Sequence, residues 1–392
     1  MDNTLLDLRC KAAGQQPPWE DPAQVERVRR EIAERPALVR STDVLALRSL
    51  LARVAAGEAQ VIQAGDCAEN PEECTAGLVA RKSAVLDLLA GSLKLITGRP
   101  VVRVGRIAGQ FAKPRSNPNE TVDGRELPVF RGHMVNGPEP QPESRRPDPL
   151  RLITGYMAAA DIMGHLGWDG PGRATMGEPA VWTSHEALLL DYELPMLRRT
   201  EDGRLLLSST HFPWIGDRTR HIDGAHVALL AEVINPVACK VGPGTNADEL
   251  LAICARLDPL RQAGRLTLIA RTSAARTAEV LPALVDAVRG AGHPVIWLTD
   301  PMHGNTVSAE DGRKRRYIET IIQEIEVFQD VVRAAGGVVG GLHLETTPDD
   351  VLECLPKASA GDHVESDGAY TSLCDPRLNP AQAMAVVGAW RP

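Results

Sequence analysis

The sequence lacks the signals that mark several large classes of protein. Its 392 residues include seven cysteines, an odd number with no Cys-x-x-Cys pair, so we expect no disulfide scaffold and favour a reducing cytoplasm. No apolar run is long enough to span a bilayer. The first stretch, MDNTLLDLRCKAAGQQPPWE, has no apolar core behind a basic head, so no signal peptide is expected. The formal net charge of -8 argues against a nucleic-acid partner, and an anionic small ligand would need a local cluster of cations.

A Gly-x-Gly-x-x-Gly turn is also missing after the first apolar run, which weakens a doubly wound open sheet as an interpretation. What is present is a recurring pattern of short apolar runs, rich in β-branched residues, that end in Gly, Asp, Arg or His. The runs occupy residues 59–66, 100–107, 180–186, 208–218, 235–243, 265–271, 293–303 and 340–345. Helical patterns separate most of them and are clearest in the second half. Eight strands that alternate with helices predict an α/β fold of the (β/α)8 TIM-barrel type.

Two segments lie outside this pattern. Residues 22–56 carry apolar side chains at helical spacing and predict two helices, the second capped by Ser41. We therefore expect an N-terminal helical extension packed on the barrel, 1–57, and a catalytic barrel, 58–392. Residues 108–178 are rich in Pro, Asn and Gly and predict a long irregular insert after the second strand that binds substrate. The N-terminal helices are candidates for a subunit interface, and we expect a homo-oligomer, either a dimer or a tetramer.

The strand ends carry the chemistry that this fold places at the mouth of the barrel. One set of strand-end residues is cationic. Four cations close together are costly to desolvate without an anion, and arginine forks match phosphate and carboxylate groups. The alternative is that each cation pairs with a neighbouring carboxylate. The four cations are Arg106, Arg218, Lys240 and Arg271.

A second set of residues combines a thiol, an imidazole and two carboxylates. Such groups together can bind a divalent metal, and a metal would stabilise the thiolate of a cysteine that is otherwise mostly protonated at neutral pH. The set does not identify the metal, since Mn²⁺, Co²⁺, Zn²⁺ and Fe²⁺ are all compatible with it. From spacing alone, a buried structural cysteine and a histidine bonded to the backbone remain open alternatives. The residues are Cys67, His303, Glu345 and Asp375.

Several longer motifs resemble one known family. The motifs, in chain order, are QAGDCAE, RVGRIAGQFAKPRS, TSHEALLLDYE, WIGDRTR, NPVACKVGP, DPMHGNT, GLHLETTPDDVLEC and LCDPRLNP. They are similar to segments of the class II 3-deoxy-D-arabino-heptulosonate 7-phosphate (DAHP) synthases, and the chain looks most like the compact branch found in phenazine and other secondary-metabolite clusters. The resemblance implies a TIM barrel that condenses phosphoenolpyruvate with erythrose 4-phosphate at the head of the shikimate route. It also implies a divalent metal, for which Mn²⁺ is our first choice.

The same resemblance implies roles for individual residues. The implied metal ligands are Cys67, His303, Glu345 and Asp375. The implied phosphoenolpyruvate ligands are Arg106, Arg218, Lys240 and Arg271, with Lys113 near that pocket. The implied ligands of the sugar phosphate are Arg115, Ser116 and Lys314. We expect the catalytic chemistry to involve Cys67 and Lys240, and both Asp217 and Glu186 are candidates for the group that handles the water added at C2. Asp66 and Glu69 are expected to orient neighbouring groups.

Five positions depart from the pattern of the family. His133 stands where Asp is usual, Asp217 where Glu is usual, and His221 where Gln is usual. Thr272 and Ser273 replace a Met-Gly pair, and Ser273 would be strained if that glycine has a positive φ. We favour drift that is compensated nearby. The alternatives are an altered acceptor, such as an amino- or imino-erythrose phosphate, and a catalytically impaired paralogue that acts as a regulatory partner.

Overall fold

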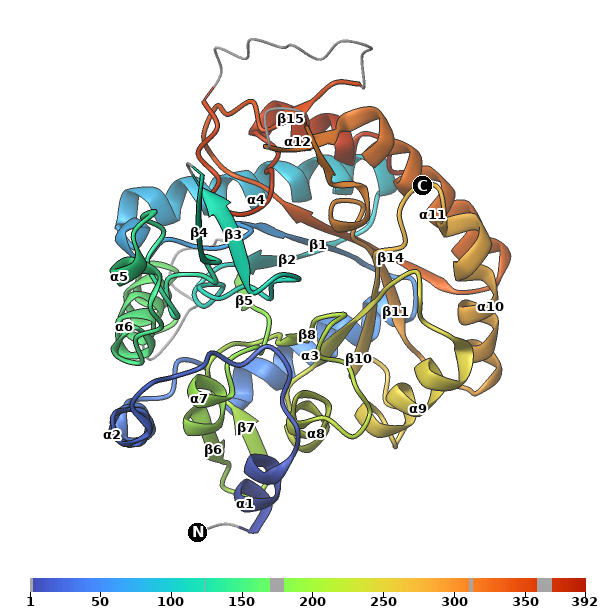
Figure 1. Ribbon diagram of the computed structural model, residues 1–392. Helices are drawn as coiled ribbons and strands as arrows, with labels where there is room; N and C mark the ends of the chain where they lie inside the picture. The colour runs from blue at the N-terminus through green and yellow to red at the C-terminus, as the bar shows by residue number, and fades with distance from the viewer. Residues whose placement is uncertain (1–2, 123, 170–179, 310–312, 358–368) are drawn as a thin grey trace.

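Eight parallel strands form the centre of the molecule. The computed structural model describes residues 3–122, 124–169, 180–309, 313–357 and 369–392. The strands follow one another in chain order around a nearly closed barrel (Figure 1). They are β1 (Gln60–Gly65), β2 (Val101–Arg106), β5 (Val181–Ser184), β8 (Trp214–Ile215), β9 (Val237–Val241), β10 (Leu266–Ala270), β11 (Ile296–Thr299) and β14 (Val338–Glu345). A bridge between Glu186 and Trp214 joins β5 to β8, the two ends of the sheet. The predicted (β/α)8 barrel is confirmed.

Helices surround the strands and connect each one to the next (Figure 1). This is the connection that parallel neighbouring strands require. In chain order, these helices are α4 (Ala76–Thr97), α6 (Leu150–His165), α7 (Leu190–Glu193), α8 (Ala225–Glu232), α9 (Ala247–Leu257), α10 (Thr277–Gly290) and α11 (Ile318–Ala334), and α12 (Pro380–Val387) follows β14. Short elements on the loops are β6 (Leu197–Arg199), β7 (Leu205–Leu207), β12 (Val307–Ser308), β13 (Lys314–Tyr317) and β15 (Cys354–Leu355), with single 3-10 turns at Pro71–Glu73, Leu194–Met196 and His303–Asn305.

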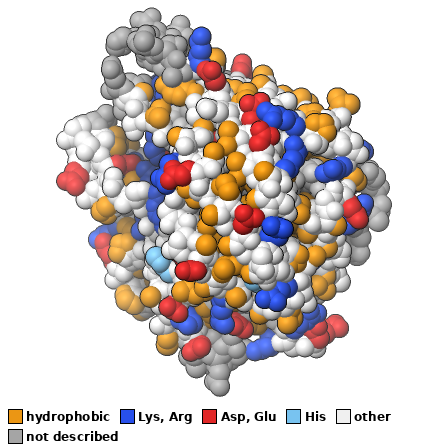
Figure 2. Space-filling view, turned by 90° about the vertical axis from the view of Figure 1, so that its right-hand side faces the viewer, with side chains coloured by type: hydrophobic (Ala, Val, Ile, Leu, Met, Phe, Trp, Pro, Cys, Tyr) orange, Lys and Arg blue, Asp and Glu red, His pale blue; other side chains and the backbone are white. Residues whose placement is uncertain are grey.

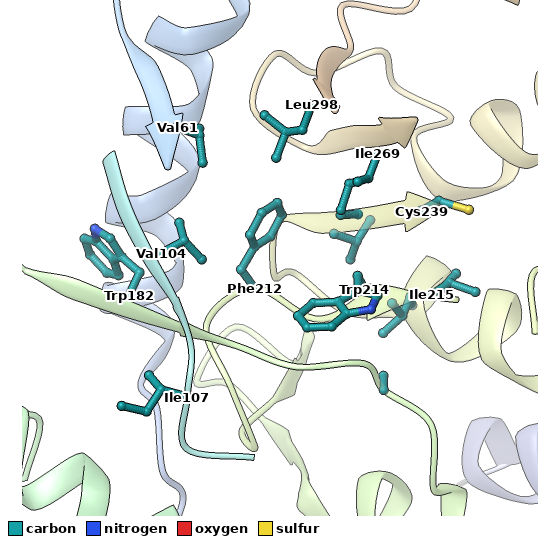
Figure 3. Packing of buried hydrophobic residues seen from close by; sticks show 14 of the residues in the cluster. Val61, Val104, Ile107, Trp182, Phe212, Trp214, Ile215, Cys239, Ile269 and Leu298 are labelled. Carbon is teal, nitrogen blue, oxygen red and sulfur yellow. The ribbon is translucent and has the colours of Figure 1, made fainter. Parts of the chain in front are cut away.

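The interior of the barrel has an apolar layer and, closer to the carboxyl ends of the strands, a polar layer. Figure 3 shows the ring of Phe212 among Val61, Val104, Ile269 and Leu298, and all five side chains are fully buried. Closer to the carboxyl ends of the strands, a chain of hydrogen bonds crosses the barrel. Gln63 Nε2 donates to Ser184 Oγ (3.1 Å), and Gln63 Oε1 accepts from His343 Nδ1 (2.8 Å). These polar groups lie between the apolar layer and the residues of the barrel mouth.

The N-terminal helices share the core of the barrel. The predicted helices are present as α2 (Pro22–Glu34) and α3 (Ser41–Ala55), and a further helix, α1 (Asn3–Cys10), was not predicted. Arg40 is the N-cap of α3, so the prediction that Ser41 caps it is wrong by one residue. Arg48 of α3 donates a hydrogen bond to Ile234 O (3.2 Å), just before β9. Gly264, before β10, lies against the backbone of the same helix, which therefore closes the amino-terminal end of the barrel.

The insert after β2 is more regular than its composition predicts. It contains a hairpin of β3 (Asn119–Val122) and β4 (Arg125–Pro128), a short helix α5 (Pro142–Arg145) and the barrel helix α6. The prediction of an irregular segment is therefore wrong for residues 150–165. In α6, Leu152, Tyr156, Ala159 and Met163 repeat at helical spacing and are buried, but Pro-rich flanks hide this signal. Residues 170–178 of the predicted insert lie outside the described residues.

The surface carries both signs of charge. Figure 2 shows one face on which acidic, basic and hydrophobic side chains are interspersed. No helix in the described ranges is both long enough and apolar enough to cross a membrane. A site for anions must therefore be sought in a local concentration of cations rather than across this face.

Candidate active site

One cavity at the carboxyl ends of the barrel strands brings the predicted site residues together. It has a volume of about 340 Å³. Its lining includes Cys67, Arg106, Lys113, Arg115, Ser116, Glu186, Asp217, Arg218, Lys240, Arg271, His303, Lys314 and Asp375. The remaining predicted residue, Glu345, is fully buried directly behind this lining, with Oε1 3.1 Å from His303 Nε2. Segments that are distant in sequence thus converge on one mouth, and Cys67 and His303 lie on the same cavity.

The candidate metal ligands form a compact group. His303, Glu345 and Asp375 each offer one ligand atom, and these atoms lie within 4.8 Å of one another. Cys67 adjoins them, because its Sγ accepts a hydrogen bond from the backbone N–H of Asp375 (3.4 Å). The other ring nitrogen of His303, Nδ1, lies 2.8 Å from Asp300 Oδ2, and such a carboxylate commonly fixes the orientation of a ligating histidine. This donor set fits a divalent cation.

The local charges favour the anionic forms of these ligands. A hydrogen bond with Cys374 lowers the pKa of the Cys67 thiol to about 6, although burial acts in the opposite direction. The Lys113 ammonium pairs with Asp375 and lies 3.4 Å from Glu345 Oε1. Burial by itself would raise the pKa of Asp375, but Lys113 and other cations hold it below its usual range. The surroundings therefore favour the thiolate of Cys67 and the carboxylate form of Asp375.

Sequence reasoning missed one of the basic side chains that support Glu345. Arg316 on β13 is fully buried, and its Nη1 donates a hydrogen bond to Glu345 Oε2 (2.6 Å). Its Nε donates to Thr306 Oγ1 (2.8 Å). Arg316 lies in the run GRKRRY, whose charges are typical of an exposed segment. Strand alternation gives no signal here either, since the adjacent Arg315 is buried as well.

The two acids that flank Cys67 organise neighbouring groups. Asp66 pairs with Lys82 (2.7 Å) and with Arg377 (2.9 Å), which ties the end of β1 to the loop that carries Asp375. Glu69 accepts hydrogen bonds from three consecutive backbone N–H groups, those of residues 108–110. It therefore orders the chain as it leaves β2 towards Lys113.

Three of the four strand-end cations have carboxylate partners. Arg106 pairs with Glu345 (2.9 Å) and Lys240 with Asp300 (2.5 Å). The remaining pair joins Arg271 to Asp217 at 2.7 Å. The alternative that each cation pairs with a neighbouring carboxylate thus holds for these three, whereas Arg218 donates a hydrogen bond to Ser116 Oγ (2.5 Å).

The cavity nevertheless carries an excess of positive charge. Its lining contains seven Lys and Arg side chains but four Asp and Glu side chains, in a chain whose formal net charge is -8. Burial lowers the pKa of Lys240 to about 8, and the neighbouring Asp300 opposes this shift. Buried cations without enough counter-charge are costly, so the cavity is suited to a small anion.

The two candidate carboxylates for proton handling differ in their surroundings. Both oxygens of Asp217 are engaged, Oδ1 by Arg220 (2.9 Å) and Oδ2 by Arg271 (2.7 Å). Glu186 Oε1 is buried and has no hydrogen-bond partner among the described residues. Burial raises the pKa of Glu186, and Lys240 partly offsets this effect. Gly216 makes room for this carboxylate, because a Cβ there would lie 2.1 Å from Oε1.

Of the five departures from the family pattern, Asp217 alone lines the cavity. His133 packs edge-on against Phe130, with ring centroids 5.2 Å apart. Ser273 has a φ of 70°, a conformation in which an L residue is strained. The strain suspected at this position is therefore present, although the Ser273 side chain lies outside the cavity lining.

The fold and the mouth together define a (β/α)8-barrel enzyme that acts on small anions beside a candidate metal site. The sequence matches the class II DAHP synthetase family over residues 3–169 and 158–389. It is 58% identical over 386 residues to a probable phospho-2-dehydro-3-deoxyheptonate aldolase of Pseudomonas fluorescens, covering 98% of this chain and 96% of the relative. A phospho-2-dehydro-3-deoxyheptonate aldolase of Streptomyces coelicolor is 38% identical over 431 positions, covering 97% and 94%.

A solved structure of a phospho-2-dehydro-3-deoxyheptonate aldolase from Francisella tularensis has a similar fold. The TM-score is 0.52 at 14% identity, covering 97% of this chain and 98% of the other. Taken with the family match, the conclusion is that the chain belongs to the class II DAHP synthetase family. Its activity is that of a 3-deoxy-7-phosphoheptulonate synthase, the first step of the shikimate pathway.

Proposed function

We propose that the barrel mouth binds phosphoenolpyruvate and D-erythrose 4-phosphate side by side and condenses them to DAHP and inorganic phosphate. The observation that carries this proposal is the gathering of seven cations and the candidate metal ligands around one cavity. The two substrates are anions that repel each other, so a cationic mouth supplies both the affinity and the orientation for their reaction.

The cations of the cavity differ in how deeply they are buried, and we assign the two substrates accordingly. Arg106 at the end of β2 is buried, as is Lys240 on β9, and with Arg271 they are suited to the carboxylate and phosphate of phosphoenolpyruvate. Arg115 and Ser116 lie on the loop after β2, nearer to solvent. We assign them, together with Lys314, to the phosphate of the sugar. Arg218 donates a hydrogen bond to Ser116 Oγ (2.5 Å), so we propose that this predicted phosphoenolpyruvate ligand lies at the boundary between the two subsites.

The candidate metal ligands account for the activation of the aldehyde. We propose that Cys67, His303, Glu345 and Asp375 bind a divalent cation, with Mn²⁺ as the first choice and Co²⁺, Zn²⁺ or Fe²⁺ as alternatives. Such an ion polarises an aldehyde carbonyl as a Lewis acid when it is bound. The residues around it prepare the site, since Asp300 orients His303 and Arg316 orients Glu345.

We assign the handling of water at C2 to Glu186 rather than to Asp217. A base must have a free oxygen near the reacting atom, and Glu186 Oε1 is buried at the cavity without a hydrogen-bond partner among the described residues. As the C2–C3 π electrons of phosphoenolpyruvate form the bond from C3 to the aldehyde carbon, the aldehyde oxygen takes up a proton and C2 becomes electron-poor. The Glu186 carboxylate accepts a proton from the water whose oxygen bonds to C2. The C2–O bond to phosphate then breaks as the new C2 hydroxyl loses its proton and becomes the ketone. Asp217 instead accepts hydrogen bonds from both Arg220 and Arg271. We therefore propose that it positions Arg271, a predicted ligand of phosphoenolpyruvate.

Phosphate release tests the choice of acceptor. The purified protein is incubated with phosphoenolpyruvate, Mn²⁺ and either erythrose 4-phosphate or its imino analogue. Release with the plain sugar supports this proposal, whereas release with the analogue alone supports an amino-DAHP synthase. No release with either sugar, under several metals, would identify a paralogue with a regulatory role.

Two substitutions test the assignment of Glu186. We expect Glu186→Gln to lower kcat by roughly 10²-fold or more with little change in either KM, because removal of a general base acts on the chemical step. Asp217→Asn should mainly raise the KM for phosphoenolpyruvate, because it releases Arg271. If Asp217→Asn lowers kcat and Glu186→Gln leaves it intact, the two roles are reversed.

We also propose that the enzyme belongs to the compact branch and feeds a secondary-metabolite pathway, such as one leading to phenazines. The alignment with the Streptomyces relative spans 431 positions, more than this chain contains, so that relative carries inserted segments that this chain lacks. A cytoplasmic homo-oligomer, dimer or tetramer, remains our expectation. Light scattering of the purified protein measures its oligomeric state directly.

A further inference from the structure

The segment between α1 and α2 approaches the mouth of the barrel, although it belongs to the N-terminal extension. We call residues 12–19 the N-terminal strap. Figure 1 shows this dark-blue part of the chain passing close to α7 and α8, on the side of the molecule where β8 lies. We propose that the N-terminal strap completes the sugar-phosphate subsite, with Gln15 as a positioning residue for Arg115. This inference rests on the proposed function, because that function gives Arg115 and Ser116 their ligand.

A direct contact joins Gln15 to the loop after β2. The side-chain Oε1 of Gln15 accepts a hydrogen bond from the backbone N–H of Arg115 (2.9 Å), which is 100 positions away in sequence. Gln15 has a φ of 63°, in the left-handed region that non-glycine residues seldom adopt. Strained residues persist where surrounding contacts determine their conformation. The strap therefore holds Gln15 in the orientation that meets Arg115.

A second contact reaches the same loop through Arg131. The backbone oxygen of Gln15 accepts a hydrogen bond from Arg131 Nη2, and that of Gln16 accepts one from Arg131 Nη1 (3.4 Å). The backbone oxygen of Arg131 in turn accepts from the N–H of Lys113 (2.9 Å). Because the strap supplies neutral carbonyl groups to Arg131, it orders these cations without adding negative charge. Arg115 Nη2 pairs with Glu120 (3.3 Å), but its Nη1 is buried without a hydrogen-bond partner among the described residues and stays available for a phosphate.

The other side of the strap is fixed to the β5–α7 loop and to the first residues of α7. Gln16 Nε2 donates to Leu188 O (2.8 Å), and Gln16 Oε1 accepts from Leu190 N (3.0 Å). Trp19 Nε1 donates to Asp191 Oδ2 (2.6 Å). This loop begins next to Glu186 at the end of β5. The strap therefore spans two sides of the mouth, from the candidate base to the candidate phosphate ligands.

Kinetics of two variants test the inference. Gln15→Gly and Gln15→Ala both remove the acceptor, but only glycine also relieves the left-handed backbone. We expect both to raise the KM for erythrose 4-phosphate by about 5- to 10-fold, the effect of one lost hydrogen bond. The KM for phosphoenolpyruvate and kcat should stay within about twofold. Gln323→Ala, on the exposed side of α11, is the matched control and should change none of these values.

Hydrogen exchange gives a readout that does not depend on activity. In the full-length protein without substrates, the amide of Arg115 should exchange about 10-fold faster in both variants than in the wild type, with unchanged exchange in the barrel strands. A wild-type enzyme that forms no DAHP would overturn the proposed function itself. An active wild type, together with variants whose KM for the sugar phosphate is unchanged, would overturn only the role of the strap. Equal changes in both KM values would also overturn it, because they would indicate a general loss of structure.

Discussion

At the scale of single residues, Ser273 offers the clearest test of local strain. Its φ of 70° costs an L residue about 1–2 kcal/mol, and Gly304 packs so closely that a Cβ there would lie 2.6 Å from Ser273 N. We expect Ser273→Gly to raise the free energy of unfolding by about 0.5–1 kcal/mol, as measured by urea denaturation. Ser273→Ala keeps the Cβ and should change it little. A glycine variant no more stable than the alanine variant would show that a Cβ is not strained in this backbone conformation.

At the scale of elements, α3 packs across the amino-terminal end of the barrel and closes it. Gly264 has a φ of 79°, and a Cβ there would lie 2.2 Å from Arg48 O and 2.6 Å from Ala52 N. Gly264→Ala therefore has to push α3 away, and we expect a loss of more than about 2 kcal/mol in thermal or urea unfolding.

The matched control for this prediction is Gly57, directly after α3. Its φ of 75° is similar, but a Cβ added at that position would meet no other atom within 4 Å. Gly57→Ala should thus cost only the backbone term, about 1 kcal/mol. The difference between the two variants measures the packing of α3 on the barrel. Equal losses would mean that α3 can move away from the barrel without cost.

At the scale of the whole molecule, a buried acid on α11 should make global stability depend on pH. Glu324 is 1% exposed and accepts a hydrogen bond from Asn305 Nδ2 (2.5 Å). Burial raises its pKa from 4.5 to about 8, so the folded protein keeps a proton that the unfolded chain loses. The free energy of unfolding should therefore fall as pH rises from about 4.5 to 8, by at most about 1.4 kcal/mol per pH unit from this group.

Urea denaturation across this pH range checks the prediction. Glu324→Gln cannot ionise, so the slope of stability against pH should become flatter in this variant. Glu319→Gln, at an exposed position on the same helix, should leave the slope as in the wild type. An unchanged slope in Glu324→Gln would show that Glu324 is ionised in the folded protein throughout this range.

The sequence by itself determined the barrel and most of its mouth. The apolar runs are periodic, and each strand of a βα barrel ends on the same side, so Arg106, Lys240, Arg271 and His303 could be placed together without coordinates. The helix α6 escaped prediction because Pro-rich flanks obscure its local pattern. Where no such flanks intervene, the spacing of hydrophobic residues is sufficient to predict a helix or a strand, because it depends on the local sequence alone.

Only the tertiary structure decided how the groups in the mouth divide their tasks. Glu186 and Asp217 both follow a strand and offer a carboxylate, so the sequence does not separate their roles. They differ because Asp217 is engaged by its neighbour Arg220 and by the distant Arg271, whereas Glu186 Oε1 is buried without a partner among the described residues. The contact of Gln15 with Arg115 spans 100 positions and leaves no periodic signal in either segment. Hydrogen bonds and pKa shifts depend on which distant groups meet and how deeply they are buried, and three-dimensional packing alone sets both.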